Sequence, residues 1–232
     1  MTGRDYIIIN GVSSHDYGLY VDTPPMPIYQ APLYESVNIF GKAEGMTFND
    51  TAREDVQIDI NAYLFDDEQS AEPNELYAFL SGAKTLQTSK SSSFEYRVKR
   101  LLSIVPAYQG HGKQLLTISF ICSPYRYSIE NDVYVSENEE VWLNNDGTMY
   151  CQPVYKLYGN GTLELKVNED TENKMVINNV SDFVVVDSER FVCYKGNEIK
   201  RCKGQFPFFN IGMNRIETNA TKIEITLNKR WL

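Results

Sequence analysis

Apolar and polar residues alternate with a period of two wherever the pattern along this chain is clear. The alternation runs through 56–62, 94–98, 116–122, 163–167 and 223–227, with apolar side chains at every second position. In a strand, alternate side chains point to the same face, so each segment packs one face against a core and leaves the other in water. Because such segments occur in both halves, the sequence predicts a mainly β protein.

One segment departs from this period and predicts a helix. After Pro73, the apolar residues Leu76, Phe79 and Leu80 are three or four positions apart, which is the spacing of one helix face. Proline suits the first turn of a helix, and Gly82 suits the position after the last turn. We expect one helix of about ten residues here.

A proline-rich segment, TPPMPIYQAP at 23–32, follows the first predicted strands. Its four prolines lack backbone donors, so an extended arm is favoured over a strand inside a sheet. An arm of this kind is suited to packing on a neighbouring subunit.

The chain of 232 residues is long enough for two domains. An acidic stretch between Pro124 and Gly147 interrupts the strand pattern, and beyond it short strands alternate with turns rich in Asn and Gly. Closely spaced short strands of this kind are typical of a sandwich or barrel. We therefore predict two β-rich domains with a boundary near residue 130.

Composition excludes several classes of protein. Hydrophobic residues make up 42% of the chain, which is too apolar for a disordered protein, and the net charge of -9 disfavours binding to a phosphate backbone. The basic cluster of Lys200, Arg201 and Lys203 is interpreted as a solvated loop. No stretch approaches the ~20 apolar residues of a membrane helix, and no signal peptide is evident, so we expect no membrane insertion and assembly in a cytoplasm.

Metal-binding and cofactor-binding motifs are missing from the sequence. The two histidines, His15 and His111, are far apart, and the four cysteines lack a C-x-x-C spacing. We expect reduced cysteines and no metal site. The phosphate-binding and dinucleotide-binding glycine motifs are also absent, as is the elbow motif of a serine nucleophile.

An acidic pair follows the apolar run 183–186. Asp187 and Glu189 are two residues apart, so on a strand they would share a face, as a glycosidase-type pair of carboxylates requires. A working acid and base must also face each other across a cleft, which different strands normally provide. The sequence therefore favours a turn between two strands over a catalytic pair, and no motif indicates an enzyme.

Aromatic residues are the remaining candidates for a binding surface. The chain has 16 tyrosines and two tryptophans, and exposed aromatics are a common means by which β-sandwiches bind sugars or proteins. Trp142, Tyr150, Tyr155 and Tyr158 are the candidates for a carbohydrate platform, although aromatics also fill sandwich cores.

The order of these features resembles the distal tail protein (Dit) family of long-tailed, non-contractile bacteriophages, the siphophages. The likeness covers essentially the whole chain and rests on a series of segments in a shared order. In VNIFGKAEG, Phe40 stands where the family commonly has proline. The segments are YIIINGVSSHDYGLYVDTPP, VNIFGKAEG, LLTISFICSPYRY, INNVSDFVVVDSERFVCYKG, FPFFNIGMNRIE and TKIEITLNKRWL.

The resemblance implies a structural virion protein of the tail tip. It implies an N-terminal β-sandwich at 1–130 that forms a hexameric ring and carries the helix, and a galectin-like sandwich at 131–232. The ring would join the major tail tube protein to the tail-associated lysin or tail fibre protein and carry receptor-binding proteins. The resemblance implies no catalysis and no cofactor.

A head-to-tail ring needs two different, complementary surfaces on one subunit. We expect Pro24, Pro25 and Pro27 of the arm to contribute one of them, with edge strands of the first domain. Asp187 and Glu189 are then expected to tolerate alanine without loss of function. The alternative is a carbohydrate-binding sandwich that recognises cell-wall polysaccharide through Trp142 or Tyr155.

Overall fold

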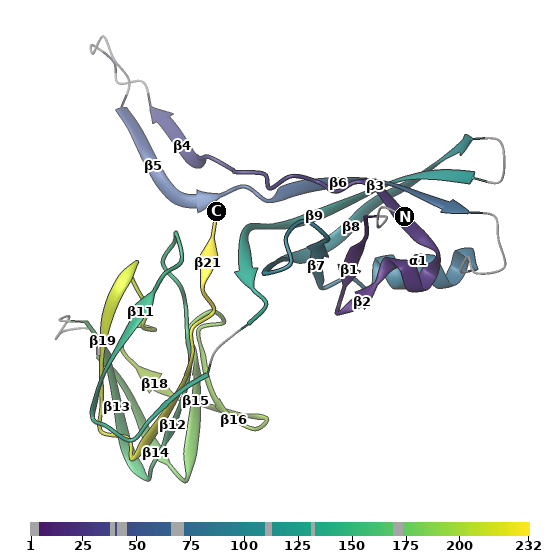
Figure 1. Ribbon diagram of the computed structural model, residues 1–232. Helices are drawn as coiled ribbons and strands as arrows, with labels where there is room; N and C mark the ends of the chain where they lie inside the picture. The colour runs from purple at the N-terminus through teal and green to yellow at the C-terminus, as the bar shows by residue number, and fades with distance from the viewer. Residues whose placement is uncertain are drawn as a thin grey trace. The chain divides into compact units, whose positions relative to one another are not determined.

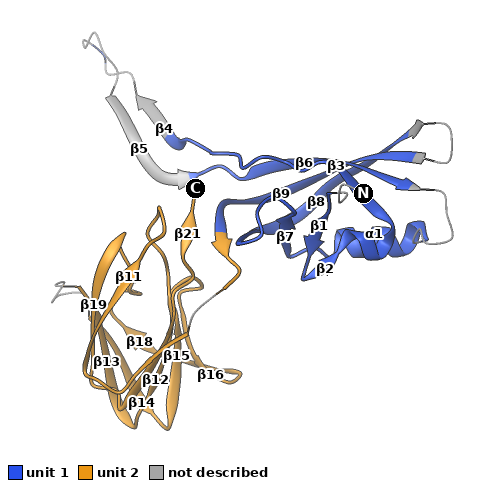
Figure 2. Cartoon of the chain, in the orientation of Figure 1, with its two compact units in different colours: residues 1–126, 232 blue, residues 127–231 orange. Residues whose placement is uncertain are grey.

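The computed structural model describes residues 5–37, 40, 46–65, 72–109, 113–130, 133–168 and 174–232. The chain is mainly β and has one α-helix among these residues, which confirms the predicted fold class. It divides into two compact units, residues 1–126 with Leu232 and residues 127–231 (Figure 2), so the division falls close to residue 130. His111 and most of the VNIFGKAEG segment lie outside the described residues.

The first unit is built on one sheet with the strand order β2-β1-β7-β8-β9-β6-β3 (Figure 1). These strands follow one continuous hydrogen-bonded path. The pairing of β6 with β9 extends from Val56 opposite Cys122 to Phe65 opposite Lys113. The strands are β1 (Ile7–Ile9), β2 (Val12–Ser13), β3 (Leu19–Thr23), β6 (Val56–Phe65), β7 (Thr85–Thr88), β8 (Phe94–Gln109) and β9 (Lys113–Ser128), and the 3-10 helix η1 (Ser14–Tyr17) joins β2 to β3.

Helix α1 (Pro73–Ser81) covers part of this sheet and confirms the predicted helix. Pro73 opens the first turn, where a missing N–H costs nothing, and the N–H of Gly82 donates to the carbonyl of Ala78 at the other end. Leu76 and Leu80 are buried in the same core as the alternate residues of the sheet. Burying one such leucine stabilises the fold by about 1.5–3 kcal/mol.

The chain leaves this sheet after β3 and returns to it at β6. In between, the proline-rich arm leads into β4 (Pro32–Val37) and β5 (Met46–Arg53), which pair only with each other as a separate two-stranded sheet. Because four prolines precede or begin β4, the arm itself has no strand structure, as predicted.

The second unit is a sandwich of two antiparallel sheets. Their strand orders are β10-β20-β12-β15-β16-β17 and β11-β19-β13-β14-β18. The strands are β10 (Val133–Ser136), β11 (Glu140–Asn145), β12 (Val154–Tyr158), β13 (Gly161–Val167), β14 (Met175–Val180), β15 (Phe183–Asp187), β16 (Val192–Lys195), β17 (Glu198–Lys200), β18 (Cys202–Lys203), β19 (Gly212–Thr218) and β20 (Lys222–Thr226). The short strand β21 (Arg230–Trp231) follows them and belongs to neither of these two sheets.

Tyr155 lies in the core of this sandwich, so its interpretation as a surface platform residue is wrong. Its side chain is fully buried, with the ring centroid 6.2 Å from that of Phe209. On β12, Tyr155 and Leu157 point inward while Lys156 points outward. The period of two therefore places the Tyr155 ring among the apolar side chains of both sheets. Burial raises the pKa of the Tyr155 hydroxyl well above its ordinary value.

Residue 232 rejoins the first unit after the sandwich is complete. The guanidinium of Arg126, the last residue before the second unit, donates to the backbone oxygen of Leu232. Residues 127–231 therefore leave the first unit and return to it at neighbouring points.

The four cysteines are separate thiols, and Cys122, Cys151 and Cys193 are buried. Burial raises the pKa of Cys122 and of Cys151 to about 12, so both thiols stay protonated at neutral pH. No helix in the part of the chain that the structure describes is both long and apolar enough to cross a membrane.

Candidate functional site

The proline-rich arm exposes apolar side chains in the first unit. Met26 and Tyr29 are 77% and 67% exposed, and Ile28 is also exposed. Pro24 is buried, whereas Pro25 and Pro27 are half-buried. The prolines hold the arm extended, and the residues between and after them present its apolar surface. The sequence signal missed these residues because an extended segment without pairing has no fixed period of exposure.

Three contacts anchor the arm on its own unit. The guanidinium of Arg126 lies 5.7 Å from the centroid of the Tyr29 ring, and Arg53 donates to the carbonyl of Gln30. The backbone of Ile28 hydrogen-bonds the hydroxyl of Tyr96, whose pKa is raised by burial. The arm is thus fixed at its base while its apolar side chains remain in water.

The second candidate surface is the outer face of the five-stranded sheet in the second unit, around Trp142. On β11, Glu140 and Trp142 point outward while Val141 and Leu143 point into the core. The pairing of β11 with β19 places Trp142 opposite Arg215. Trp142 is 55% exposed, and Met213 on β19 is 59% exposed.

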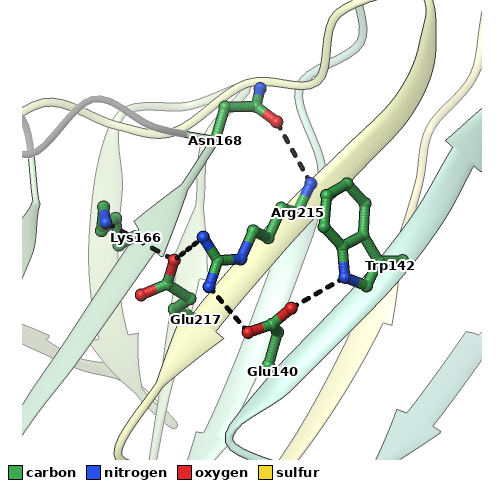
Figure 3. Close-up of polar contacts among 6 residues, drawn as sticks. All are labelled: Glu140, Trp142, Lys166, Asn168, Arg215 and Glu217. Atoms are coloured by element: carbon green, nitrogen blue, oxygen red, sulfur yellow. Dashed lines mark hydrogen bonds and ion pairs between the residues drawn. The ribbon is translucent and has the colours of Figure 1, made fainter.

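A chain of charged side chains crosses this face from β11 through β19 to β13 (Figure 3). The indole N–H of Trp142 donates to Oε1 of Glu140 at 2.8 Å, and Nη2 of Arg215 lies 2.7 Å from the other oxygen of that carboxylate. Nη1 of Arg215 lies 3.1 Å from Glu217, and Lys166 is 3.5 Å from the same Glu217 oxygen. We call Glu140, Trp142, Lys166, Arg215 and Glu217 the Trp142 face.

These contacts determine what the Trp142 face can do chemically. Hydrogen bonds from Arg215, and secondly from Trp142, hold the pKa of the Glu140 carboxyl below its ordinary value. A carboxylate ionised in this way is a poor general acid. Exposed Trp, Met and Arg are the residues enriched at protein interfaces, and a held indole presents a flat apolar surface. The geometry therefore supports docking, not acid–base chemistry.

Asp187 and Glu189 form the predicted turn between β15 and β16. Oδ1 of Asp187 accepts hydrogen bonds from the backbone N–H groups of Glu189 at 3.1 Å and Arg190 at 3.0 Å. The Glu189 carboxylate lies 3.2 Å from the guanidinium of Arg230. Both carboxylates thus have structural partners. An alanine at either position would remove these contacts, so the expectation that alanine is tolerated here needs a test of stability.

The fold of the whole chain is similar to that of a solved protein structure. The chain is similar to the crystal structure of the SPP1 Dit protein, described as a paradigm of the hub adsorption apparatus in phages that infect Gram-positive bacteria. The TM-score is 0.75, and the likeness covers 99% of this chain and 100% of the SPP1 protein at 11% sequence identity. No family model and no curated protein matches the sequence.

Proposed function

We propose that this protein is a distal tail protein, the baseplate hub of a siphophage or related prophage tail. Six copies form a ring that connects the tail tube to the tail-associated lysin or tail fibre protein and carries the receptor-binding proteins. The role is structural, with no catalysis and no cofactor, and it is exercised at the virion tail tip after assembly in the host cytoplasm. The observation that carries the proposal is the fold shared with SPP1 Dit over the full length of both chains.

The first unit is the part suited to forming the ring. A ring with head-to-tail contacts joins two different surfaces of neighbouring subunits. The sheet of this unit ends in two different edges, β2 on one side and β3 on the other, and the arm continues from β3. The exposed Met26 and Tyr29 supply apolar area for such a contact. In the proposed ring, the second unit would be a galectin-like sandwich on the periphery.

Particle mass and shape test this proposal directly. Light scattering and negative-stain imaging of the purified chain at high concentration should reveal an annulus of six subunits. The double variant Met26→Asp with Tyr29→Asp should lower the particle mass to that of a monomer with unchanged circular dichroism. Tyr77→Asp is the matched control, because Tyr77 is another exposed aromatic of the first unit, at 60%.

Substitution is a sharper test than deletion of residues 24–27. Pro24 is buried, so the deletion would also disturb the fold. A monomer at every concentration would contradict the proposed ring. An annulus that persists in the double aspartate variant would contradict the proposed interface.

A second candidate function is carbohydrate binding by the Trp142 face. The observation that favours it is an exposed indole held by Glu140, because such a ring can stack on a sugar. Binding of purified cell-wall polysaccharide that disappears in Trp142→Ala would support it, and unchanged binding would remove it.

A further inference from the structure

A pocket lies in the second unit, away from the Trp142 face, where the chain passes from one sheet of the sandwich to the other. β17 is the last strand of the six-stranded sheet and β18 is the last strand of the five-stranded sheet, with Arg201 between them. The pocket has a volume of about 510 Å³, within the usual range for small-ligand sites. Its lining residues are Asn178, Asn179, Glu198, Ile199, Lys200, Arg201, Cys202 and Lys203.

Two cations of the pocket point to the same side. Cys202 is half-buried and packs against the core of the sandwich. Because alternate residues of an extended chain point to opposite sides, Arg201 and Lys203 both point outward, and both are exposed. The third cation, Lys200, is held by Glu198 at 2.8 Å.

Arg201 and Lys203 differ from the other basic residues of the second unit. Residues 127–231 contain twelve Lys and Arg, and ten of them lie within 4 Å of a carboxylate oxygen. Only Arg201 and Lys203 have no such partner among the described residues, and both line the pocket. In a chain with a net charge of -9, two neighbouring cations without carboxylates form an unusual local excess of positive charge.

The remaining lining residues add neutral donors and one apolar side chain. Asn178 and Asn179 are exposed on β14, and the amide of Asn179 has no hydrogen-bond partner within the described ranges. The backbone of Asn179 is left-handed, with φ of 57°, which turns the strand at the rim of the pocket. Ile199 is 76% exposed beside these groups.

We propose that this pocket binds a phosphate group carried on a sugar or polyol chain. An arginine fork and a neighbouring ammonium suit the oxygens of a phosphate, amide groups suit hydroxyls, and an aliphatic side chain suits the apolar side of a sugar. An acidic peptide fits less well. Peptide binding by strand addition needs a longer edge than the three residues of β17, and a protein interface needs a larger surface than this pocket. The proposed phosphate site does not depend on whether the protein forms the proposed ring.

Binding of the full chain to an immobilised polyglycerol-phosphate polymer tests the inference. The double variant Arg201→Ala with Lys203→Ala should weaken binding by about tenfold or more, because both phosphate contacts are lost. Lys156→Ala with Lys222→Ala is the matched control, since it removes the same charge from two lysines already paired with Glu224. The control and Trp142→Ala should bind as the unaltered chain does.

Three further probes separate the possible ligands, with the urea midpoint of each variant as the check on folding. Neutral dextran should not bind, and polyglutamate should bind more weakly than the phosphate polymer. Inorganic phosphate should displace the polymer only at a large molar excess over the polymer's phosphate groups, because it lacks the hydroxyls that the asparagines would contact. An equal loss of binding in the paired-lysine control, or a loss only in Trp142→Ala, would overturn the proposal. So would polyglutamate binding as tight as polymer binding, or displacement of the polymer by an equimolar amount of phosphate.

Discussion

Arg215 and Arg230 belong to the same sandwich and each lies within 4 Å of a carboxylate, but their side chains differ in exposure to water. Arg215 lies on the Trp142 face with its side chain 33% exposed, between Glu140 and Glu217. The side chain of Arg230 is only 7% exposed, with Nη2 at 2.7 Å from Gln152 and 3.2 Å from Glu189. Exposed pairs contribute little to stability because water competes for both charges, whereas a buried charge that loses its partner is costly.

The rings around Arg230 extend this contrast. Its guanidinium lies 5.8 Å from the Tyr127 ring centroid and 5.9 Å from that of Tyr150. Its backbone oxygen accepts hydrogen bonds from the N–H groups of Thr148 at 3.1 Å and Met149 at 3.3 Å. Arg230 therefore connects residues 230–231 to the turn after β11. The side-chain contacts of Arg215 with Glu140 and Glu217 lie on the outer face of one sheet. We therefore expect Arg230 to determine the stability of the second unit and Arg215 to contribute to recognition.

Replacing Arg230 should have the largest effect. Arg230→Met leaves Glu189 and Gln152 without their partner and should lower the free energy of unfolding of the second unit by about 3 kcal/mol. Urea unfolding followed by tryptophan fluorescence reports on this unit, because both tryptophans, Trp142 and Trp231, belong to it. Arg190→Met is the control, since the Arg190 side chain is 78% exposed. If Arg230→Met and Arg190→Met lower the free energy of unfolding equally, burial of the Arg230 side chain does not explain the loss.

Gly147→Ala probes the backbone beside Arg230. A Cβ at Gly147 would lie 2.5 Å from the backbone oxygen of Arg230, so the backbone must shift, at a cost of about 1–3 kcal/mol. The comparison is Gly196→Ala, where the added Cβ meets nothing within 4 Å but φ is 58°. Gly196→Ala should cost about 1–2 kcal/mol through backbone strain alone. A stable Gly147→Ala protein would show that this contact is loose.

The turn at Asp187 should give a smaller change. Asp187→Ala removes the acceptor for two backbone N–H groups and should cost about 1–2 kcal/mol by the same fluorescence assay. Asp187→Asn keeps an acceptor oxygen at that position and should recover most of the loss. If alanine and asparagine are equally destabilising, the carboxylate charge and its 3.7 Å contact with Arg190 are responsible instead.

Arg215→Ala should change the free energy of unfolding least, by no more than about 0.5 kcal/mol, because the side chain is on a solvated face. That small difference should shrink further at high salt, where exposed charges are screened. An effect as large as that of Arg230→Met would mean that the Trp142 face is part of the folding core.

Titration of Glu140 should be visible without a measurable loss of stability. Because the folded-state pKa of Glu140 lies below its ordinary value, its bonds to Arg215 and Trp142 are complete above the ordinary value. They are lost as the pH falls through the lowered value. The indole N–H resonance of Trp142 should follow this step in an NMR titration, and Glu140→Gln should abolish it. A step at or above the ordinary glutamate pKa would contradict the contacts on this face.

Much of the fold follows from local sequence pattern. The alternation predicted the strands, Pro73 and Gly82 predicted the helix, and the polar residues after Val186 predicted the turn. The inward position of Tyr155 was also encoded in the sequence, because Tyr155 lies two residues from Leu157 on the same strand. These are short-range signals, which a single strand or turn carries by itself.

The candidate surfaces depend on contacts between distant segments and were less predictable. The pairing that brings Arg215 beside Glu140 joins residues 75 positions apart. Arg201 and Lys203 were interpreted as a solvated loop, since nothing in the local sequence indicates that two sheet edges flank them with a pocket. The exposed side chains of the arm likewise follow from its anchoring by Arg126 and Arg53, not from its prolines.

The contact between Arg126 and Leu232 has a consequence for how such a protein diversifies. A segment whose two ends meet behaves as a closed loop, and the entropy of closing a loop rises only slowly with its length. Residues 127–231 can therefore be exchanged for a longer or shorter domain at little thermodynamic cost to the strands that precede them. The first unit can therefore stay unchanged while residues 127–231 are replaced by another domain.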